Sequence, residues 1–279
     1  MSNIHPTAII APGAQIPASC SIGPYCSIGP DVVLGEECEL ISHVVLDGHL
    51  TLGRGNRIFS FACIGVAPQD LKYAGEPTRC ELGDNNTIRE SVTISRGTVG
   101  GGGLTRIGSG CLIMAYVHIG HDCQIGDGCI LANAATLAGH VTIEEYAVVG
   151  ALCPVHQYCR IGRYSYIGGG TTITQNVLPY SLTCIERNNH AYGLNKVGLE
   201  RRGFTPAQIK QLRAAYRLLQ ASKLNTTDAL AAIRATLLAE GGAGSAADTT
   251  AASALDPAAV DHVRYLADFI AASPRGIIK

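Results

Sequence analysis

Three side chains in the stretch MAYVHIGHDCQIG have types and a spacing that suit acid–base or metal chemistry. They are His118, His121 and Asp122, and His140 and His156 follow further along the chain. An imidazole has a pKa of about 6.5, so a His held by a carboxylate can serve as a general base at neutral pH. Three neutral imidazoles that converge at about 2 Å from one ion would instead form a metal site. These residues alone leave both chemistries open.

A repeat of six residues indicates the elements that must position these side chains. An aliphatic residue stands at every sixth position over residues 4–64, 82–94 and 107–173. Two insertions interrupt the repeat, QDLKYAGEPT (residues 69–78) and RGTVGGGGLT (residues 96–105). A period of six suits a coil with three short faces and about 18 residues per turn. Residues about 18 apart would stack on adjacent coils, so the four histidines are predicted to converge.

Small residues occupy two fixed places in the repeat. Nine of the eleven cysteines lie two residues before an aliphatic position of the repeat, and in another repeat the same position holds Ala62. These nine cysteines are therefore predicted to face inward as small structural residues. No Cys-x-x-Cys pair occurs, which disfavours a zinc knuckle, and many single thiols suit a reducing cytoplasm. A glycine often follows the aliphatic residue and predicts a turn with unusual backbone angles. These glycines are Gly23, Gly29, Gly35, Gly53, Gly65, Gly83, Gly108, Gly120, Gly126, Gly150, Gly162 and Gly168.

Helical signals replace the six-residue period toward the C-terminus. The pair Thr205–Pro206 predicts a helix N-terminus, a second helix is predicted to begin near Asp228, and a last helix near Asp256. The Ala- and Gly-rich segment near 241–254 predicts a flexible linker by its composition. A small helical cap is therefore expected beside the coil.

Charge is distributed unevenly over the two expected domains, a solenoid at residues 1–190 and a helical domain at residues 191–279. The chain has a formal net charge of −1, which argues against nucleic acid as a partner. Residues 200–223, by contrast, hold six basic residues and one acid, Glu200, which suggests an acidic or phosphorylated partner. A solvated helix face explains the same excess equally well.

No segment of the sequence predicts export or a membrane span. The chain lacks a run of about 18 consecutive apolar residues, and its start, MSNIHPTAII, has no basic region followed by an apolar run. The hydrophobic content of 47% is ample for a folded core. We therefore expect a soluble, cytoplasmic protein with no integral membrane segment.

Several motifs, taken together, resemble those of one enzyme family. In chain order they include HPTAII, SHVVLDGH, QDLKYAGEPTR, IRESVTISRGT, HIGHDCQIGDGCILANAATLAGHV, VHQYCRIG and GLNKVGLERRGFT. The set resembles the UDP-N-acetylglucosamine O-acyltransferases that begin lipid A synthesis in Gram-negative bacteria, from residue 1 to about 220 and including both insertions. The resemblance implies a mainly β fold, the left-handed parallel β-helix of hexapeptide-repeat proteins with a C-terminal α-helical domain, assembled as a homotrimer.

The resemblance also implies a mechanism. His121 matches the family's catalytic base, which takes the proton from the sugar 3-hydroxyl of UDP-N-acetylglucosamine, and Asp122 matches the residue that supports it. The hydroxyl oxygen then attacks the thioester of a 3-hydroxyacyl chain on acyl carrier protein. Gly139 matches the glycine whose backbone N–H stabilises the tetrahedral oxyanion. Neither a metal ion nor a cofactor is implied.

Further positions match the family's substrate contacts. Around the nucleotide sugar these are Asp70, Lys72, His118, His140, His156 and Gln157. For the uridine and phosphate they are Asn195, Arg201 and Arg202, and for the acyl chain they are Gly169 and His190. Glycine at the position that limits acyl length leaves room for a longer chain. Ser95 and Val197 depart from residues that are common in the family.

Three other functions remain open. A zinc enzyme of the carbonic anhydrase type would space two ligands four residues apart, with a third about two coils earlier, whereas only two residues separate His118 from His121. Acylation of a 3-amino sugar, which gives an amide, would use the same base and oxyanion donor. A non-enzymatic structural or binding solenoid would lose no activity when His121 is replaced by Ala.

Overall fold

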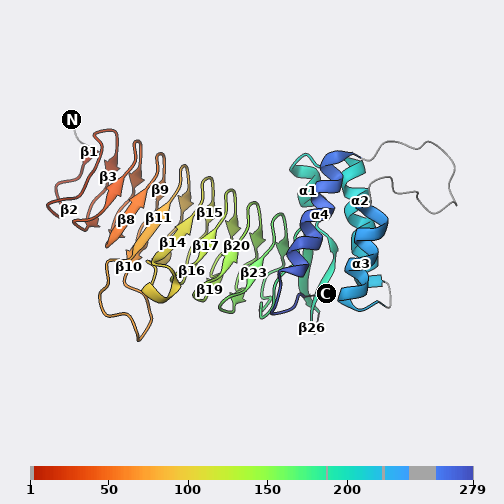
Figure 1. Ribbon diagram of the computed structural model, residues 1–279. Coiled ribbons are helices and arrows are strands. Elements are labelled where there is room, and N and C mark those ends of the chain that lie inside the picture. Colours follow the sequence, from red (N-terminus) through yellow and green to blue (C-terminus); the bar gives the residue numbers. More distant parts are fainter. Residues whose placement is uncertain (1–2, 187, 222–223, 239–255, 279) are drawn as a thin grey trace.

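The protein is a long coil of short strands with a helical cap at its C-terminal end (Figure 1). The computed structural model describes residues 3–186, 188–221, 224–238 and 256–278. Apart from a terminal hairpin, the strands pair in parallel within three sheets, and each sheet takes its strands from successive turns of the coil. This architecture is the parallel β-helix that the six-residue repeat predicts.

The three sheets run side by side along the coil. In the first sheet lie β1 (Asn3–Ile4), β3 (Ser21–Ile22), β6 (Glu39–Leu40), β9 (Arg57–Ile58), β12 (Thr87–Ile88), β15 (Leu112–Ile113), β18 (Ile130–Leu131), β21 (Val148–Val149), β24 (Tyr166–Ile167), β25 (Ser181–Glu186) and β26 (Asn188–Leu194). In the second lie β2 (Ile9–Ile10), β4 (Ser27–Ile28), β7 (Val45–Leu46), β10 (Cys63–Val66), β13 (Thr93–Ser95), β16 (His118–Ile119), β19 (Thr136–Leu137) and β22 (Pro154–Val155). In the third lie β5 (Val33–Leu34), β8 (His49–Leu52), β11 (Arg79–Leu82), β14 (Leu104–Ile107), β17 (Gln124–Ile125), β20 (Thr142–Ile143) and β23 (Arg160–Ile161).

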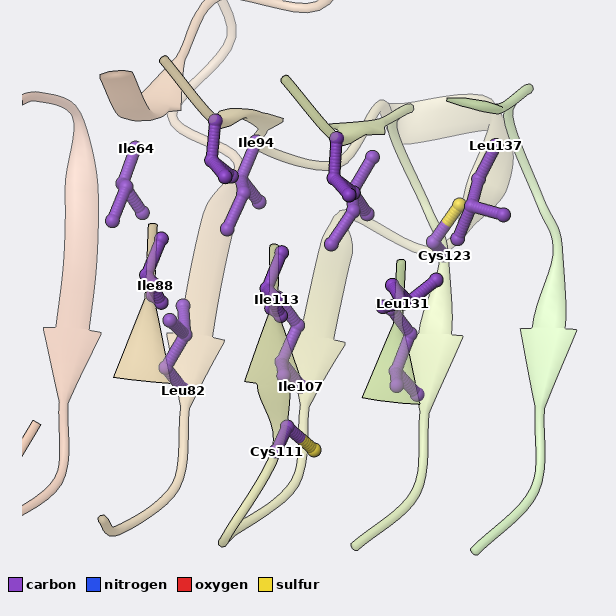
Figure 2. Packing of buried hydrophobic residues seen from close by; sticks show 14 of the residues in the cluster. Ile64, Leu82, Ile88, Ile94, Ile107, Cys111, Ile113, Cys123, Leu131 and Leu137 are labelled. Carbon is purple, nitrogen blue, oxygen red and sulfur yellow. The ribbon is translucent and has the colours of Figure 1, made fainter. Parts of the chain in front are cut away.

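The aliphatic residue of each repeat points into the coil. Parallel pairing sets Ile88 beside Ile113, and Figure 2 shows such side chains stacked from coil to coil, with Ile64 near Ile94. Ile88, Ile94 and Ile119 are all 0% exposed. Burying each such side chain contributes about 1.5–3 kcal/mol. The core is a narrow column of aliphatic layers, which suits a chain with no tryptophan and only four phenylalanines.

The cysteines fill the inward slot that the repeat predicts for them. All nine are buried, each at most 2% exposed, and none forms a disulfide. Burial raises the pKa of Cys80 and of Cys123 to about 12, so both thiols are protonated at neutral pH. Here the cysteines act as small apolar side chains.

The predicted role of the glycines that follow the aliphatic residues is wrong. Of these twelve glycines only Gly65 has a left-handed φ, and the left-handed residues instead stand three positions after the aliphatic residue, as at Tyr25, Tyr116 and Asp122. The glycines are small for a different reason, because a side chain would strike the next coil. A Cβ built on Gly23 would lie 1.7 Å from the carbonyl oxygen of Ile41.

The cap contains five helical segments among the described residues. They are α1 (Lys196–Arg201), α2 (Pro206–Tyr216), the π-helical segment η2 (Arg217–Ala221), α3 (Thr226–Leu237) and α4 (Pro257–Ala271). The predicted start at Thr205 is confirmed by a capping box with Gln208, and Asp256 caps α4 as predicted. Asn225 caps α3, which begins two residues before Asp228. The predicted linker near 241–254 lies outside the described residues.

The cap is fixed to the end of the coil through the hairpin of β25 and β26 and through a cluster of polar groups. Arg160 of the coil donates to Glu144, which also accepts from the hydroxyl of Tyr265 on α4. Arg163 donates to the hydroxyl of the buried Tyr180 at 2.7 Å. Within the described part of the chain, no helix is both long and apolar enough to cross a membrane.

Candidate active site

His121 and Asp122 lie at the corner of the coil between β16 and β17. Asp122 occupies the left-handed corner position with φ 59°, and His140 and Tyr158 occupy the same position on the next two coils with φ 62° and 63°. The side chains of Asp122, His140 and Tyr158 therefore stack along one edge of the coil. Gly139 is the residue in line with His121. The structure thus brings His121 and His140 together at one corner.

The carboxylate of Asp122 is buried and hydrogen-bonded on both oxygens. Its side chain is 1% exposed, and its Oδ2 lies 2.8 Å from Nδ1 of His121. The backbone N–H of Thr98 donates to Oδ1 at 2.8 Å, and the hydroxyl of Thr98 donates to Oδ2 at 2.6 Å. An ionised carboxylate can only accept, so in the neutral imidazole the proton sits on Nδ1. The Nε2 of His121 is then free to accept a proton.

Glycine at position 139 lets the His121 ring lie directly against the backbone of the next coil. A Cβ built on Gly139 would lie 2.7 Å from Nε2 of His121, so no larger residue fits without moving the ring. The Gly139 N–H has no acceptor among the described residues. His140 meets the His121 ring edge-on, with centroids 5.0 Å apart at 89°, and stacks on Tyr158 at 4.4 Å and 8°. The site therefore pairs a proton acceptor with a free backbone donor.

His118 lies on β16, on the residue before the inward-facing Ile119. Its Nδ1 lies 2.8 Å from the hydroxyl oxygen of Thr93. Burial lowers the pKa of His118 below its ordinary value, and the neighbouring His121 lowers it further. His118 is therefore neutral at neutral pH, and it can hydrogen-bond a polar substrate group without placing a second positive charge beside His121.

The two insertions enclose a cavity next to this corner. The first insertion leaves the coil after β10 as the orange loop of Figure 1, and Arg96 of the second holds it through a hydrogen bond of 3.0 Å to the hydroxyl of Tyr73. Asp70 accepts from the backbone N–H of Lys72 at 3.0 Å. The cavity measures about 190 Å³, and its lining includes Asp70, Lys72, Glu76, Thr98, His140 and Tyr158. A cavity with both charges and ring faces suits a polar, sugar-like ligand.

Comparison with known proteins decides the family. Residues 176–278 match the family described as Udp N-acetylglucosamine O-acyltransferase, domain 2, and residues 104–139 match the bacterial transferase hexapeptide repeats. An acyl-[acyl-carrier-protein]–UDP-N-acetylglucosamine O-acyltransferase from Anaeromyxobacter sp. (strain Fw109-5) is 49% identical over 234 residues, which is 84% of this chain and 91% of the relative. This chain belongs to the UDP-N-acetylglucosamine O-acyltransferase family.

Solved structures of family members have the same fold. The UDP-N-acetylglucosamine O-acyltransferase of Moraxella catarrhalis superposes with a TM-score of 0.88 at 40% identity, over 99% of this chain and 100% of that one. A structure from Acinetobacter baumannii superposes with a TM-score of 0.87 at 41% identity, over the same shares. The β-helix with its helical cap is therefore the architecture of this acyltransferase family.

Three positions matched to uridine and phosphate contacts lie on the cap. Asn195 caps α1, where its Oδ1 accepts from the Gly198 N–H at 3.2 Å and its amide donates to the Tyr164 carbonyl oxygen at 3.1 Å. Arg201 and Arg202 are exposed at the end of α1. The guanidinium of Arg202 lies 4.5 Å from the centre of a tyrosine ring on the coil. The cap thus presents two exposed cations, of which Arg202 lies against a tyrosine ring, while Asn195 also caps its own helix.

Other expected contacts lie further from His121 within one chain. Gly169 is at the corner that follows the first sheet, whereas His121 is at the corner that follows the second. Gln157 occupies the same position as His121 and Gly139, one coil beyond Gly139. Nδ1 of His156 lies 3.1 Å from the Gln157 carbonyl oxygen. The backbone of His190 pairs with β25, but its side chain lies outside the described part of the structure.

The structure adds two residues that the sequence analysis missed. Tyr158 could have been found, because it stands 18 residues after His140 and 36 after Asp122 in an unbroken repeat. Thr98 could not, because it lies in the second insertion, where the period gives no position relative to the coil. Its two hydrogen bonds to Asp122 become visible only when the chain is folded.

The corner also resembles a metal site, because one ligand atom each of His121, Asp122 and His140 lie within 4.8 Å of one another. Both carboxylate oxygens, however, already accept hydrogen bonds from Thr98, and Oδ2 also faces Nδ1 of His121. A metal ion would have to displace these bonds to reach the carboxylate. The arrangement therefore favours proton transfer over zinc chemistry.

Proposed function

We propose that this protein transfers a 3-hydroxyacyl chain from acyl carrier protein to the 3-hydroxyl of UDP-N-acetylglucosamine, the first step of lipid A synthesis. The observation that carries the proposal is the hydrogen bond of 2.8 Å between His121 and the buried Asp122, next to the Gly139 N–H, which has no acceptor among the described residues. Membership in the acyltransferase family supports the choice of substrates. No cofactor is needed for this reaction, since the thioester supplies an activated acyl group.

The proton movements follow from the orientation of His121. Its Nε2 takes the proton of the sugar 3-hydroxyl while the oxygen attacks the thioester carbon. The imidazolium that forms is stabilised by the carboxylate of Asp122 at Nδ1. The carbon–sulfur bond then breaks, and the proton on Nε2 passes to the departing thiolate of the carrier. The products are an ester and a free thiol, so His121 returns to its neutral state.

The tetrahedral intermediate needs a hydrogen-bond donor beside the base. We assign this part to the N–H of Gly139, which lies one coil from His121 and has no acceptor within the described residues. A preorganised donor of this kind is worth about 10²–10³ in rate. His118, His140, Asp70 and Lys72 surround the cavity or the corner and would orient the sugar and its phosphates.

The chain is proposed to work as a homotrimer with its sites between subunits. Gly169, proposed to limit acyl length, lies at a different corner from His121, so a neighbouring subunit would have to supply it to the same site. That corner also carries exposed hydrophobic side chains, with Tyr25, Phe61, Tyr116 and Leu152 each at least 58% exposed. An apolar row of this length is typical of a surface that another chain covers.

The basic face of the cap is proposed to receive the carrier protein. Between β26 and α2 lies a cavity of about 290 Å³, and Lys196, Arg213 and Arg217 are among the residues that line it. Acyl carrier protein brings a phosphate on its prosthetic group, and clustered cations attract such a group. Arg201 and Arg202 are proposed to bind the phosphates of the nucleotide.

The unpaired cysteines also support a cytoplasmic location.

The product identifies the reaction directly. Purified protein is incubated with UDP-N-acetylglucosamine and a series of 3-hydroxyacyl carrier proteins of different chain length, and the product is analysed by mass spectrometry. The expected product is a mono-acylated sugar nucleotide whose ester is cleaved by mild base. Acylation only of the 3-amino analogue, giving a base-stable amide, would contradict the proposed acceptor, and stoichiometric zinc with hydration of carbon dioxide would contradict the whole assignment.

A further inference from the structure

Thr98 lies in the second insertion, directly over the corner that holds His121 and Asp122. It is 7% exposed and precedes the short 3-10 helix η1 (Val99–Gly101) as its N-cap residue. A Thr at this place ordinarily accepts a hydrogen bond from its own helix. Here the side chain makes no capping bond, and its hydroxyl instead donates to Oδ2 of Asp122 at 2.6 Å. The Thr98 hydroxyl therefore binds the Asp122 carboxylate and does not cap the helix.

The insertion is shaped to fit this carboxylate closely. A Cβ built on Gly101 would lie 2.1 Å from the carboxyl carbon of Asp122, so glycine is required where η1 crosses it. The Asp122 N–H donates to the hydroxyl oxygen of Thr105 at 2.8 Å, at the end of the same insertion. One loop thus holds Asp122 through its backbone, both of its oxygens and one of its faces.

The Thr98 hydroxyl and the His121 imidazole both contact the same carboxylate oxygen of Asp122. Oδ2 accepts from the Thr98 hydroxyl and faces Nδ1 of His121 at 2.8 Å, while Oδ1 accepts from the Thr98 N–H. With three donors the carboxylate can neither rotate nor turn toward His140, whose Nδ1 lies 3.8 Å from Oδ2. Charge-assisted bonds of this kind are short and directional. The orientation of the His121 ring therefore depends on Thr98.

We propose that Thr98 is a positioning residue for acyl transfer, which acts through Asp122 to hold His121 as the base. The inference rests on the proposed function. Loss of its hydroxyl removes one of the three donors that hold the carboxylate, so the His121 ring is held less firmly and turnover falls while the sugar nucleotide still binds in the cavity. The effect should appear in kcat and hardly at all in KM, because the base acts only in the transition state.

The test compares three single variants of the full-length protein in acylation of UDP-N-acetylglucosamine. Thr98→Val removes the hydroxyl but keeps the shape and the N–H, and kcat should fall about 10- to 50-fold with KM within about twofold. Thr98→Ser keeps the hydroxyl and should stay within about threefold of the wild type. Thr78→Val is the matched control, since Thr78 is also buried in an insertion but its hydroxyl has no partner among the described residues, and it should leave kcat unchanged.

The same substitution made in a protein that already lacks His121 distinguishes a positioning role of Thr98 from a folding defect. In His121→Ala, adding Thr98→Val should change the residual rate by less than about twofold, because the base that Thr98 serves is gone. An equal loss in both backgrounds, or a kcat of Thr98→Val within twofold of wild type, overturns the inference. If the wild-type protein itself does not acylate the sugar nucleotide, the proposed function fails instead, so the two failures are distinguishable.

Discussion

The regular coil and its two insertions contribute to the candidate site in different ways. The coil fixes Asp122, His140 and Tyr158 at one corner position on three successive turns, and their φ values agree within 4°. The insertions have no such period, yet they supply Thr98 over the carboxylate and Asp70 and Lys72 in the adjacent cavity. The repeat therefore fixes the position of the proposed base, whereas the two irregular insertions supply residues around it.

The largest expected effect comes from removing the proposed base, His121. His121→Ala should lower kcat by about 10²–10⁴-fold, since that is the usual contribution of a general base. His49→Ala is the matched control, because His49 is exposed on β8, a strand of the third sheet. Steady-state kinetics with the carrier-bound substrate measure both. Near-complete activity in His121→Ala would show that the corner is not catalytic.

The next effect tests the coil as a scaffold. Ile119 lies next to His118 on β16 and is 0% exposed, so Ile119→Ala opens a cavity in the core. The free energy of unfolding should fall by about 2–5 kcal/mol. Denaturant unfolding measures this loss, and Thr78→Val, a buried substitution in an insertion, is measured beside it. Equal losses in the two variants would mean that the insertions are as stabilising as the coil.

A smaller effect is expected from a methyl group placed in the second insertion. Gly101→Ala would push η1 away from Asp122, because the new Cβ would lie 2.1 Å from the carboxyl carbon. We expect kcat to fall about tenfold, while the melting temperature changes little, since the loop contributes nothing to the aliphatic core. Kinetics and thermal unfolding on one preparation provide the test. A large drop in melting temperature would show that the loop is part of the fold's stability.

The smallest effect concerns pH and His118. Its pKa is lowered in the folded protein, so the unfolded chain binds the proton more readily as the pH falls. The stability contributed by neutral His118 is therefore complete above about pH 6.5 and is lost as the pH falls through the lower folded pKa. Denaturant midpoints at pH 7.5 and pH 5.0 should differ less in His118→Gln than in the wild type. An unchanged pH dependence would contradict the lowered pKa.

Sequence alone predicted the coil well because its physical cause is local and repeated. The aliphatic residue at every sixth position, as at Ile88 and Ile119, predicts both which side chains point into the coil and how many residues make one turn of it. The same arithmetic placed His140 one coil from His121. It misjudged the glycines, since contact with the next coil rather than φ explains why Gly23 is small. Spacing along one coil predicts backbone angles poorly when the constraint comes from a neighbouring coil.

The contacts made by the two insertions could not be predicted from residue spacing. Nothing in the spacing of RGTVGGGGLT indicates that Thr98 donates twice to Asp122, because the loop returns to the coil by a path with no period. The corner of Gly169 could have been predicted, because Gly169 stands 48 residues after His121 in the unbroken repeat, and 48 is not a multiple of the 18 residues in one turn of the coil. The family resemblance named the three proposed catalytic positions, His121, Asp122 and Gly139. The structure places Asp122 within hydrogen-bonding distance of His121 and leaves no room for a Cβ between Gly139 and the His121 ring.

We expect His121 and Asp122 to act together as one catalytic pair. A double-mutant cycle of His121→Ala and Asp122→Asn tests it, with kcat for acylation of UDP-N-acetylglucosamine measured in all four proteins. The double variant is expected to be no slower than His121→Ala, because Asp122 acts only through the imidazole it holds. Losses that multiply in the double variant would contradict the claim, since Asp122 would then contribute independently of His121.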